Sequence, residues 1–157
     1  MKLLLAIALV FSPAFAFHSD EALVEAAKHS EVVVAAEVVS VDRSPGYWSG
    51  VLASVQHVRY RVLETLKGKV QHTDIDAGHY VVANSLTADR KMAQLSTTLF
   101  KPGNHVVLML SRERGHGCRL DDAPDGVEAF CSPDENTGAT LASPSLIRKL
   151  RESLSRE

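Results

Sequence analysis

The hydrophobic residues of this chain fall into two patterns, and both predict β-strands. Residues 31–41, EVVVAAEVVSV, are β-branched and almost continuously apolar, as in a strand that is buried on both faces. Residues 105–110, HVVLML, form a second run of this kind. Residues 51–68 instead alternate, with Val58 and Tyr60 separated by polar side chains, which predicts a long strand with one dry and one wet face.

Helical spacing appears only near the two ends. Residues 18–30 predict a short helix with Ser19 or Asp20 as its N-cap and acidic residues in its first turn. Near the other end, Ser143 is a predicted N-cap and Pro144 the first helical residue. The expected buried stripes are Leu23, Ala26 and Ala27 in the first helix, and Leu146, Ile147, Leu150 and Leu154 in the second.

Turn residues divide the remaining chain into further short strands. Gly68 ends the alternating strand, and Pro102-Gly103 predicts a type II turn before residue 105. We expect the other strands at 70–77, near 80–83, at 118–120 and at 127–131, with a long loop at 84–98 and a hairpin tip at 114–117. Several strands with a helix at each end predict a small β-barrel or sandwich.

The first sixteen residues, MKLLLAIALVFSPAFA, have the pattern of a signal peptide. Lys2 precedes an apolar run, and Ala14-Phe15-Ala16 gives the small-x-small pattern of a cleavage site. The run is shorter than the roughly 18 residues that a membrane-spanning helix needs. We therefore expect residues 1–16 to be removed and residues 17–157 to form one exported domain, periplasmic or secreted, without stable membrane insertion.

Charge and cysteine content narrow the expected partners and the compartment. The formal net charge is −2, so there is no electrostatic reason to expect nucleic acid as a partner. Only two cysteines occur, Cys118 and Cys131. In an oxidising compartment they predict one disulfide, worth on the order of 3 kcal/mol. A redox-active pair is the alternative, but such pairs usually have the CxxC spacing, which is absent.

Three segments together resemble exported bacterial proteins of the netrin/TIMP-like class. They are residues 32–41, residues 60–68 with the ending VLETLKG, and residues 100–110. The resemblance implies a five-stranded Greek-key barrel of the OB type with flanking helices. The metalloproteinase inhibitors of that class depend on an N-terminal cysteine. Here the mature chain is expected to begin at Phe17 and the first cysteine is Cys118, so inhibition is not carried over.

The stretch HTDIDAGHY, residues 72–80, is the strongest candidate for a metal site. On a strand His72, Asp74 and Asp76 would point to one face about 7 Å apart, with His79 close behind. A second, looser group of possible ligands is His105, His116 and Cys118.

The alternative interpretation of HTDIDAGHY is structural. The same alternation is what the solvated face of a half-buried strand requires. In that case Asp74 and Asp76 would pair across strands with Arg59 and Arg61.

Tyr47 and Trp48 are an adjacent aromatic pair in a turn segment. They are suited to anchor a partner or a sugar, whereas the alternative is that Trp48 plugs one end of the barrel. The sequence has no GxSxG elbow and no glycine-rich phosphate loop, so no enzyme activity and no cofactor are predicted.

The expected function is a non-catalytic binding module for an unknown protein or small ligand, which acts through residues 43–50 and 84–98. The alternative is a metal-binding protein or metal-dependent enzyme that uses the histidines and aspartates of residues 72–79.

Overall fold

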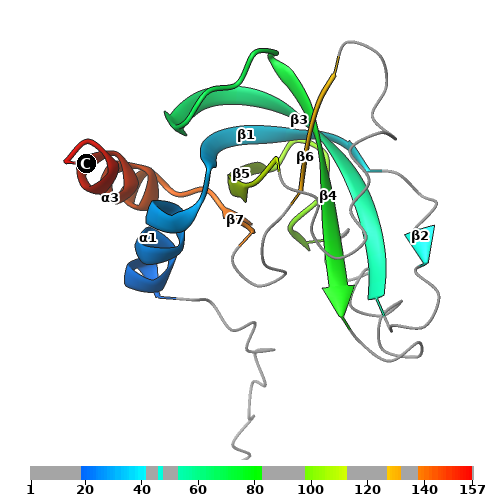
Figure 1. Cartoon of the computed structure of the whole chain (residues 1–157), viewed down its shortest axis with the longest axis horizontal. Coiled ribbons are helices and arrows are strands. Elements are labelled where there is room, and N and C mark those ends of the chain that lie inside the picture. Colours follow the sequence, from blue (N-terminus) through cyan, green and yellow to red (C-terminus); the bar gives the residue numbers. More distant parts are fainter. Residues whose placement is uncertain are drawn as a thin grey trace, which may run out of the picture.

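A computed structural model describes residues 19–41, 46–47, 53–82, 98–112, 127–131 and 138–156. This part of the chain is mainly β: one curled mixed sheet with two helices packed against it (Figure 1). The predicted leader, most of the predicted loop at 84–98, the predicted strand at 118–120 and the hairpin tip at 114–117 lie outside the described residues.

The sheet has the strand order β6-β4-β3-β1-β5-β7, with the short strand β2 paired to β3. The strands are β1 (Val32–Val41), β2 (Gly46–Tyr47), β3 (Ala53–Lys67), β4 (Asp74–Val82), β5 (His105–Leu110), β6 (Glu128–Cys131) and β7 (Ala139–Leu141). Neighbouring strands are antiparallel except β4 and β6, which run parallel. The prediction of a mainly β architecture is confirmed.

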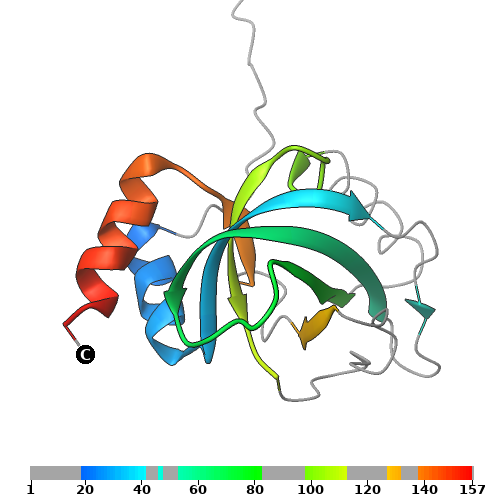
Figure 2. The ribbon, with the colours of Figure 1, turned by 90° about the horizontal axis from the view of Figure 1, so that it is seen from above.

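The sheet curls into a half-barrel, as Figure 2 shows. Register shifts along the β1–β3 pairing mark bulges, which bend and twist a strand pair. An isolated antiparallel bridge joins Ser111, directly after β5, to Cys131 in β6, and its two amide–carbonyl hydrogen bonds are each 2.9 Å long. The bridge therefore links the end of β5 to β6, so the two strands at opposite ends of the series β6, β4, β3, β1 and β5 touch at one point.

The core has two layers on opposite faces of β1 and β5. Alternate residues such as Val34 and Leu108 point into the curl of the sheet, where they meet Tyr60, Phe100 and Phe130. The residues between them face the helices, and this second layer consists of Leu23, Ala27, Val33, Val107, Met109, Leu146 and Leu150. Both faces of the two strands are thus buried, which explains why their sequences are apolar without alternation.

The helices α1 (Asp20–His29) and α3 (Pro144–Leu154) lie side by side on one side of the sheet (Figure 2). Ser19 and Ser143 cap them, each accepting a hydrogen bond from a backbone amide in the first turn. Both caps and both predicted buried stripes are confirmed, with Ala26, Ile147 and Leu154 only partly buried. Neither described helix is long and apolar enough to cross a membrane.

The two predicted glycine turns are confirmed by positive φ angles. Gly68 has a φ of 76° and Gly103 a φ of 88°. At Gly103 the amide of Asn104 donates to the carbonyl of Lys101 at 3.0 Å, which closes the four-residue turn before β5.

The predicted strands at 70–77 and near 80–83 are wrong as two elements, because the structure has one strand, β4, from Asp74 to Val82. Residues 70–73 are not in a strand. Their polar backbone groups bind elsewhere: the amide of Gln71 donates to a carboxylate oxygen of Glu128 at 2.7 Å, and the carbonyl of Thr73 accepts from Val62 at 2.7 Å. The short strand β7 was not predicted.

Candidate binding face on strands β3 and β4

The outer face of the β3–β4 pair presents charged side chains from both strands. His57, Arg59 and Arg61 alternate with the buried residues of β3, and Asp74 and Asp76 alternate with those of β4. In the register Arg61 lies opposite Asp74 and Arg59 lies opposite Asp76. The predicted cross-strand placement of these four residues is confirmed.

The contacts on this face differ from the simple pairing. Arg61 Nε lies 3.6 Å from Asp74 Oδ1, and both side chains are about half exposed, so this ion pair is weak. Asp76 does not bind Arg59. It accepts a hydrogen bond from the ring of His57, diagonally across the strands, with 2.9 Å between Nδ1 and Oδ1. Arg59 forms no ion pair with any residue in the described part of the chain.

The His57–Asp76 contact fixes the chemistry of the imidazole. The side chains are 23% and 12% exposed, so the hydrogen bond is partly shielded from water. A carboxylate that accepts from Nδ1–H favours the tautomer in which Nε2 has the lone pair. The contact with Asp76 thus orients the ring of His57, which the alternation pattern alone did not indicate.

The four residues of the predicted metal site do not converge. His72 is exposed and precedes β4, while Asp74 and Asp76 point outward. His79 is an odd number of positions from both aspartates, so it points to the opposite face of the strand, into the core. No group of three or more His, Cys, Asp or Glu side chains able to hold a metal ion occurs among the described residues. Of the second group, His105 is exposed at the start of β5, and His116 and Cys118 lie outside the described residues.

His79 takes part in a buried polar contact inside the curl of the sheet. Its Nε2 lies 2.8 Å from the hydroxyl of Tyr60, and its ring centroid is 4.7 Å from that of Phe100. Burial, with a smaller contribution from His57, lowers the pKa of His79 to about 3. Burial, followed by the charge of Asp76, raises the pKa of Tyr60 well above its usual value. Both groups are therefore neutral near pH 7.

The two chain segments predicted to bind a partner attach to the same end of the sheet. The end of β1 lies beside β3, where Val41 pairs with Val58, and the start of β3 lies beside the end of β4, where Ala53 pairs with Val82. The end of β1, the start of β3 and the end of β4 therefore all lie at this end. Within the first segment β2 sets the backbone of Tyr47 beside Ser54, whereas the side chain of Tyr47 and the whole of Trp48 lie outside the described residues.

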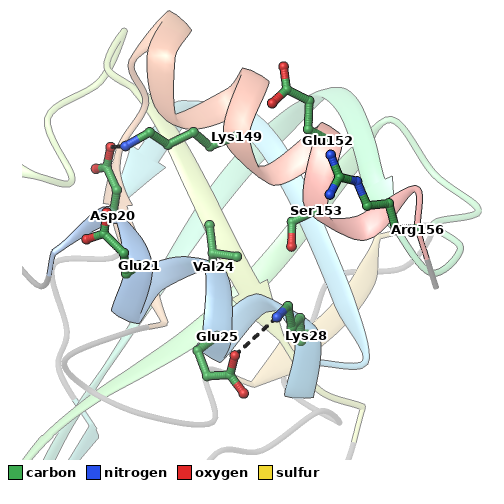
Figure 3. A pocket seen from close by; sticks show the side chains of 9 residues that line it. All are labelled: Asp20, Glu21, Val24, Glu25, Lys28, Lys149, Glu152, Ser153 and Arg156. Carbon is green, nitrogen blue, oxygen red and sulfur yellow. Dashed lines mark hydrogen bonds and ion pairs between the residues drawn. The ribbon is translucent and has the colours of Figure 1, made fainter.

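A groove of about 610 Å³ lies between α1 and α3 (Figure 3). Its lining is Asp20, Glu21, Val24, Glu25 and Lys28 from α1 with Lys149, Glu152, Ser153 and Arg156 from α3. Lys149 bridges the helices to Asp20 at 2.6 Å, and Lys28 pairs with Glu25 at 3.3 Å. Ligand sites are mostly apolar with a few polar groups, whereas this lining is almost entirely charged, as on an ordinary solvated helix surface.

Arg112 forms a contact network that sequence patterns gave no reason to expect. Its guanidinium binds Glu31 at 2.8 Å, Glu128 at 2.7 Å and the carbonyl of Lys69 at 2.6 Å, and it lies over the ring of Phe130. The network joins the residue before β1, the turn before β4 and strand β6. It strengthens the closure at which Ser111 meets Cys131, so its role is structural.

Cys131 is buried on β6, but its predicted partner Cys118 lies outside the described residues, so the disulfide stays a prediction. Searches for related proteins give no family to which the chain belongs: no protein-family model matches it, and no curated protein matches its sequence.

Proposed function

We propose that this protein is an exported, non-catalytic binding module built on a barrel of the OB type. The strand order supports this fold assignment. Numbered along the chain without β2 and β7, the first strand pairs with the second and the fourth, and the third runs parallel to the fifth. The Ser111–Cys131 bridge joins the fourth and fifth strands at one point, which supports the proposed five-stranded Greek-key barrel.

One observation supports a binding role above the others: the end of β1, the start of β3 and the end of β4, which directly precede or follow the predicted binding segments, lie together at one end of the sheet. A rigid barrel that presents long connections at one end is a common arrangement for recognition. Barrels of the OB type bind ligands on the face of their second and third strands and with the loop between their first and second strands, which correspond here to the β3–β4 face and to residues 42–52.

The charges on this face suggest what kind of partner it suits. The cations Arg59 and Arg61 are balanced by Asp74 and Asp76, and the whole chain is slightly acidic, so a polyanion such as nucleic acid is a poor match. Arg59, without an ion pair among the described residues, offers directional hydrogen bonds. A protein surface or a small polar ligand such as a sugar fits this arrangement.

The test is a double substitution, Tyr47→Ala with Trp48→Ala, followed by capture of partners from the envelope fraction of the source cells. We expect the bound partner to be lost. The matched control is Glu152→Ala with Arg156→Ala, in the groove between the helices, which should capture the same partners as the unaltered protein. Retention of every partner by the aromatic double variant would contradict the proposed binding segment.

A second candidate function, metal binding, keeps one specific observation in its favour. Histidines that bind metals usually have their other ring nitrogen hydrogen-bonded to a carboxylate, and Asp76 holds His57 in this way. Elemental analysis of protein purified without an affinity tag tests this candidate. A stoichiometric metal that is lost in His57→Gln supports it, and a metal-free protein with no thermal shift on adding zinc, copper or calcium eliminates it.

A further inference from the structure

Two polar side chains lie inside the otherwise apolar curl of the sheet. Tyr60 is 0% exposed and His79 is 5% exposed, and the residues packed around the interior are almost all aliphatic or aromatic. The tyrosine hydroxyl and His79 Nε2 are 2.8 Å apart, which is a normal hydrogen-bond length. Neither side chain has another hydrogen-bond partner among the described residues.

The hydrogen-bond inventory of this pair does not balance. A neutral imidazole has one N–H donor and one acceptor nitrogen, and a tyrosine hydroxyl has one O–H donor. If the hydroxyl donates to Nε2, the proton of the imidazole is on Nδ1 and has no acceptor. If Nε2–H donates to the hydroxyl oxygen instead, both the hydroxyl proton and Nδ1 lack partners. The first arrangement leaves fewer groups unpaired, and it leaves a buried N–H donor.

Buried donors in folded proteins are nearly always paired, with water or a ligand where the protein supplies no acceptor. We infer that the interior of the barrel binds one hydrogen-bond acceptor at Nδ1 of His79, either an ordered water molecule or an oxygen atom of a small molecule. The acceptor lies in the plane of the imidazole, because that is where the N–H points, while the ring of Phe100 packs near one imidazole face at a tilt of 34°. The site is independent of the outer face of β3 and β4.

The position of His79 shows where this interior site lies in the sheet. His79 pairs in register with Gln56, close to the end of β4 and the start of β3. The site therefore lies toward the end of the barrel at which residues 42–52 and 83–97 attach. A small molecule held there would be compact and largely apolar, with one acceptor oxygen, because the surrounding core side chains include Val58, Ala77 and Phe100.

Nitrogen-15 NMR of the full-length protein tests the inference. We expect the proton of the His79 ring on Nδ1, exchanging slowly with solvent and in contact either with a water resonance or with a resonance of a co-purified molecule. The exposed His29, at 79% exposure, is the matched control and should show no protected ring proton. A ring proton on Nε2, or an unprotected Nδ1 proton, overturns the inference.

The variant Tyr60→Phe tests whether a bound acceptor or the tyrosine hydroxyl keeps the proton of the His79 ring on Nδ1. If a bound acceptor holds the Nδ1 proton, the ring keeps that tautomer after the hydroxyl is removed. A shift to Nε2–H in a folded Tyr60→Phe protein shows that Tyr60 alone set the tautomer, and it contradicts the inference. If this variant fails to fold, the measurement on the unaltered protein decides.

The source of the acceptor is identified by extraction. Denatured wild-type protein that releases a defined small molecule, which His79→Phe does not release, identifies a ligand. Contact with water and no released molecule identifies an ordered water.

Discussion

At the scale of single residues, His79 is a buried group whose protonation opposes folding. Its pKa lies at about 3 in the folded protein and near 6.5 in an unfolded chain, because burial disfavours the charged ring. Below pH 6.5 the unfolded state therefore takes up a proton that the folded state does not. The free energy of unfolding falls as the pH decreases from 6.5 toward 3, and above pH 6.5 His79 makes no pH-dependent contribution.

We predict that His79→Phe reduces this acid sensitivity. The expected difference between pH 7 and pH 4 is on the order of a few kcal/mol larger in the wild type than in the variant. Urea unfolding at several pH values measures it. His29→Gln, which removes an exposed histidine, should keep the wild-type slope. An identical slope for wild type and His79→Phe would show that His79 titrates normally.

A second prediction at this scale concerns the two glycines with positive φ. At Gly68 a Cβ atom would also lie 2.5 Å from the carbonyl oxygen of Glu31, which a real Cβ does not tolerate, whereas at Gly103 nothing lies within 4 Å. Gly103→Ala should cost about 1–2 kcal/mol for backbone strain. Gly68→Ala should cost clearly more, because β1 or the turn must also move. Chemical denaturation of both variants measures the order, and equal losses would contradict it.

At the scale of elements, the sequence predicted the helix caps and turns, because these features depend on residues close together in the chain. Ser19 and Ser143 cap their helices through contacts only three residues away, and the turn before β5 depends on Pro102 and Gly103. Strands β1 and β5 were found because both faces are buried. The predicted alternation of residues 72–76 on one strand face holds for Asp74 and Asp76 but not for His72, which precedes the strand. The amide of the preceding residue, Gln71, binds Glu128 of β6, which is distant in sequence, so no local pattern could show where the strand begins.

The same limit applies to the candidate site. The alternation of charges predicted that Arg59 and Arg61 would face Asp74 and Asp76, and the register confirms it. It could not predict that His57 takes the contact with Asp76, because a diagonal contact depends on side-chain conformation as well as register. His79 was grouped with the aspartates by proximity in sequence, although its odd spacing already indicated the opposite face.

The contact between Arg112 and Glu128 joins strand β6 to the segment directly after β5. Glu128 is partly buried; burial disfavours its charge, but hydrogen bonds from Arg112 and from the amide of Gln71 outweigh this and lower its pKa. Arg112→Met removes the hydrogen bond from Arg112, keeps the one from Gln71, and leaves the carboxylate without this cation. We expect a loss of about 1–2 kcal/mol, a value that already allows for the solvent exposure of Arg112.

The loss should be local as well as global. In Arg112→Met, hydrogen exchange should become faster at the amides of Ser111 and Cys131, which form the closing bridge. The increase there should be larger than the increase at the centre of β1. Arg61→Met is the matched control, because its ion pair with Asp74 is longer and more exposed, and it should change stability by less than about 0.5 kcal/mol. Equal effects of the two variants would show that Arg112 is not a closing contact.

At the scale of the whole molecule, the strand order is the property that the hydrophobic pattern could not predict. Periodicity identifies strands but does not say which of them pair, and here β1 lies between β3 and β5 while β4 pairs with the distant β6. The closure also depends on a short strand, since β6 has four residues and meets Ser111 at a single bridge. A covalent constraint at β6 would therefore act directly on the closure.

The predicted disulfide between Cys118 and Cys131 would be such a constraint, because Cys131 is the residue of β6 that forms the bridge to Ser111. By restricting the unfolded chain, a bond that closes so short a loop adds on the order of 3 kcal/mol of stability. We expect exported protein to react with no thiol reagent until it is reduced, and then with two equivalents, as intact-mass measurement would show. Reduction should lower the urea midpoint. Cys118→Ser with Cys131→Ser, which cannot form the bond, should unfold at the same urea concentration with and without reductant. Two reactive thiols in the unreduced protein would contradict the predicted disulfide. The contact between β5 and β6 would then depend on Arg112 and the backbone bridge.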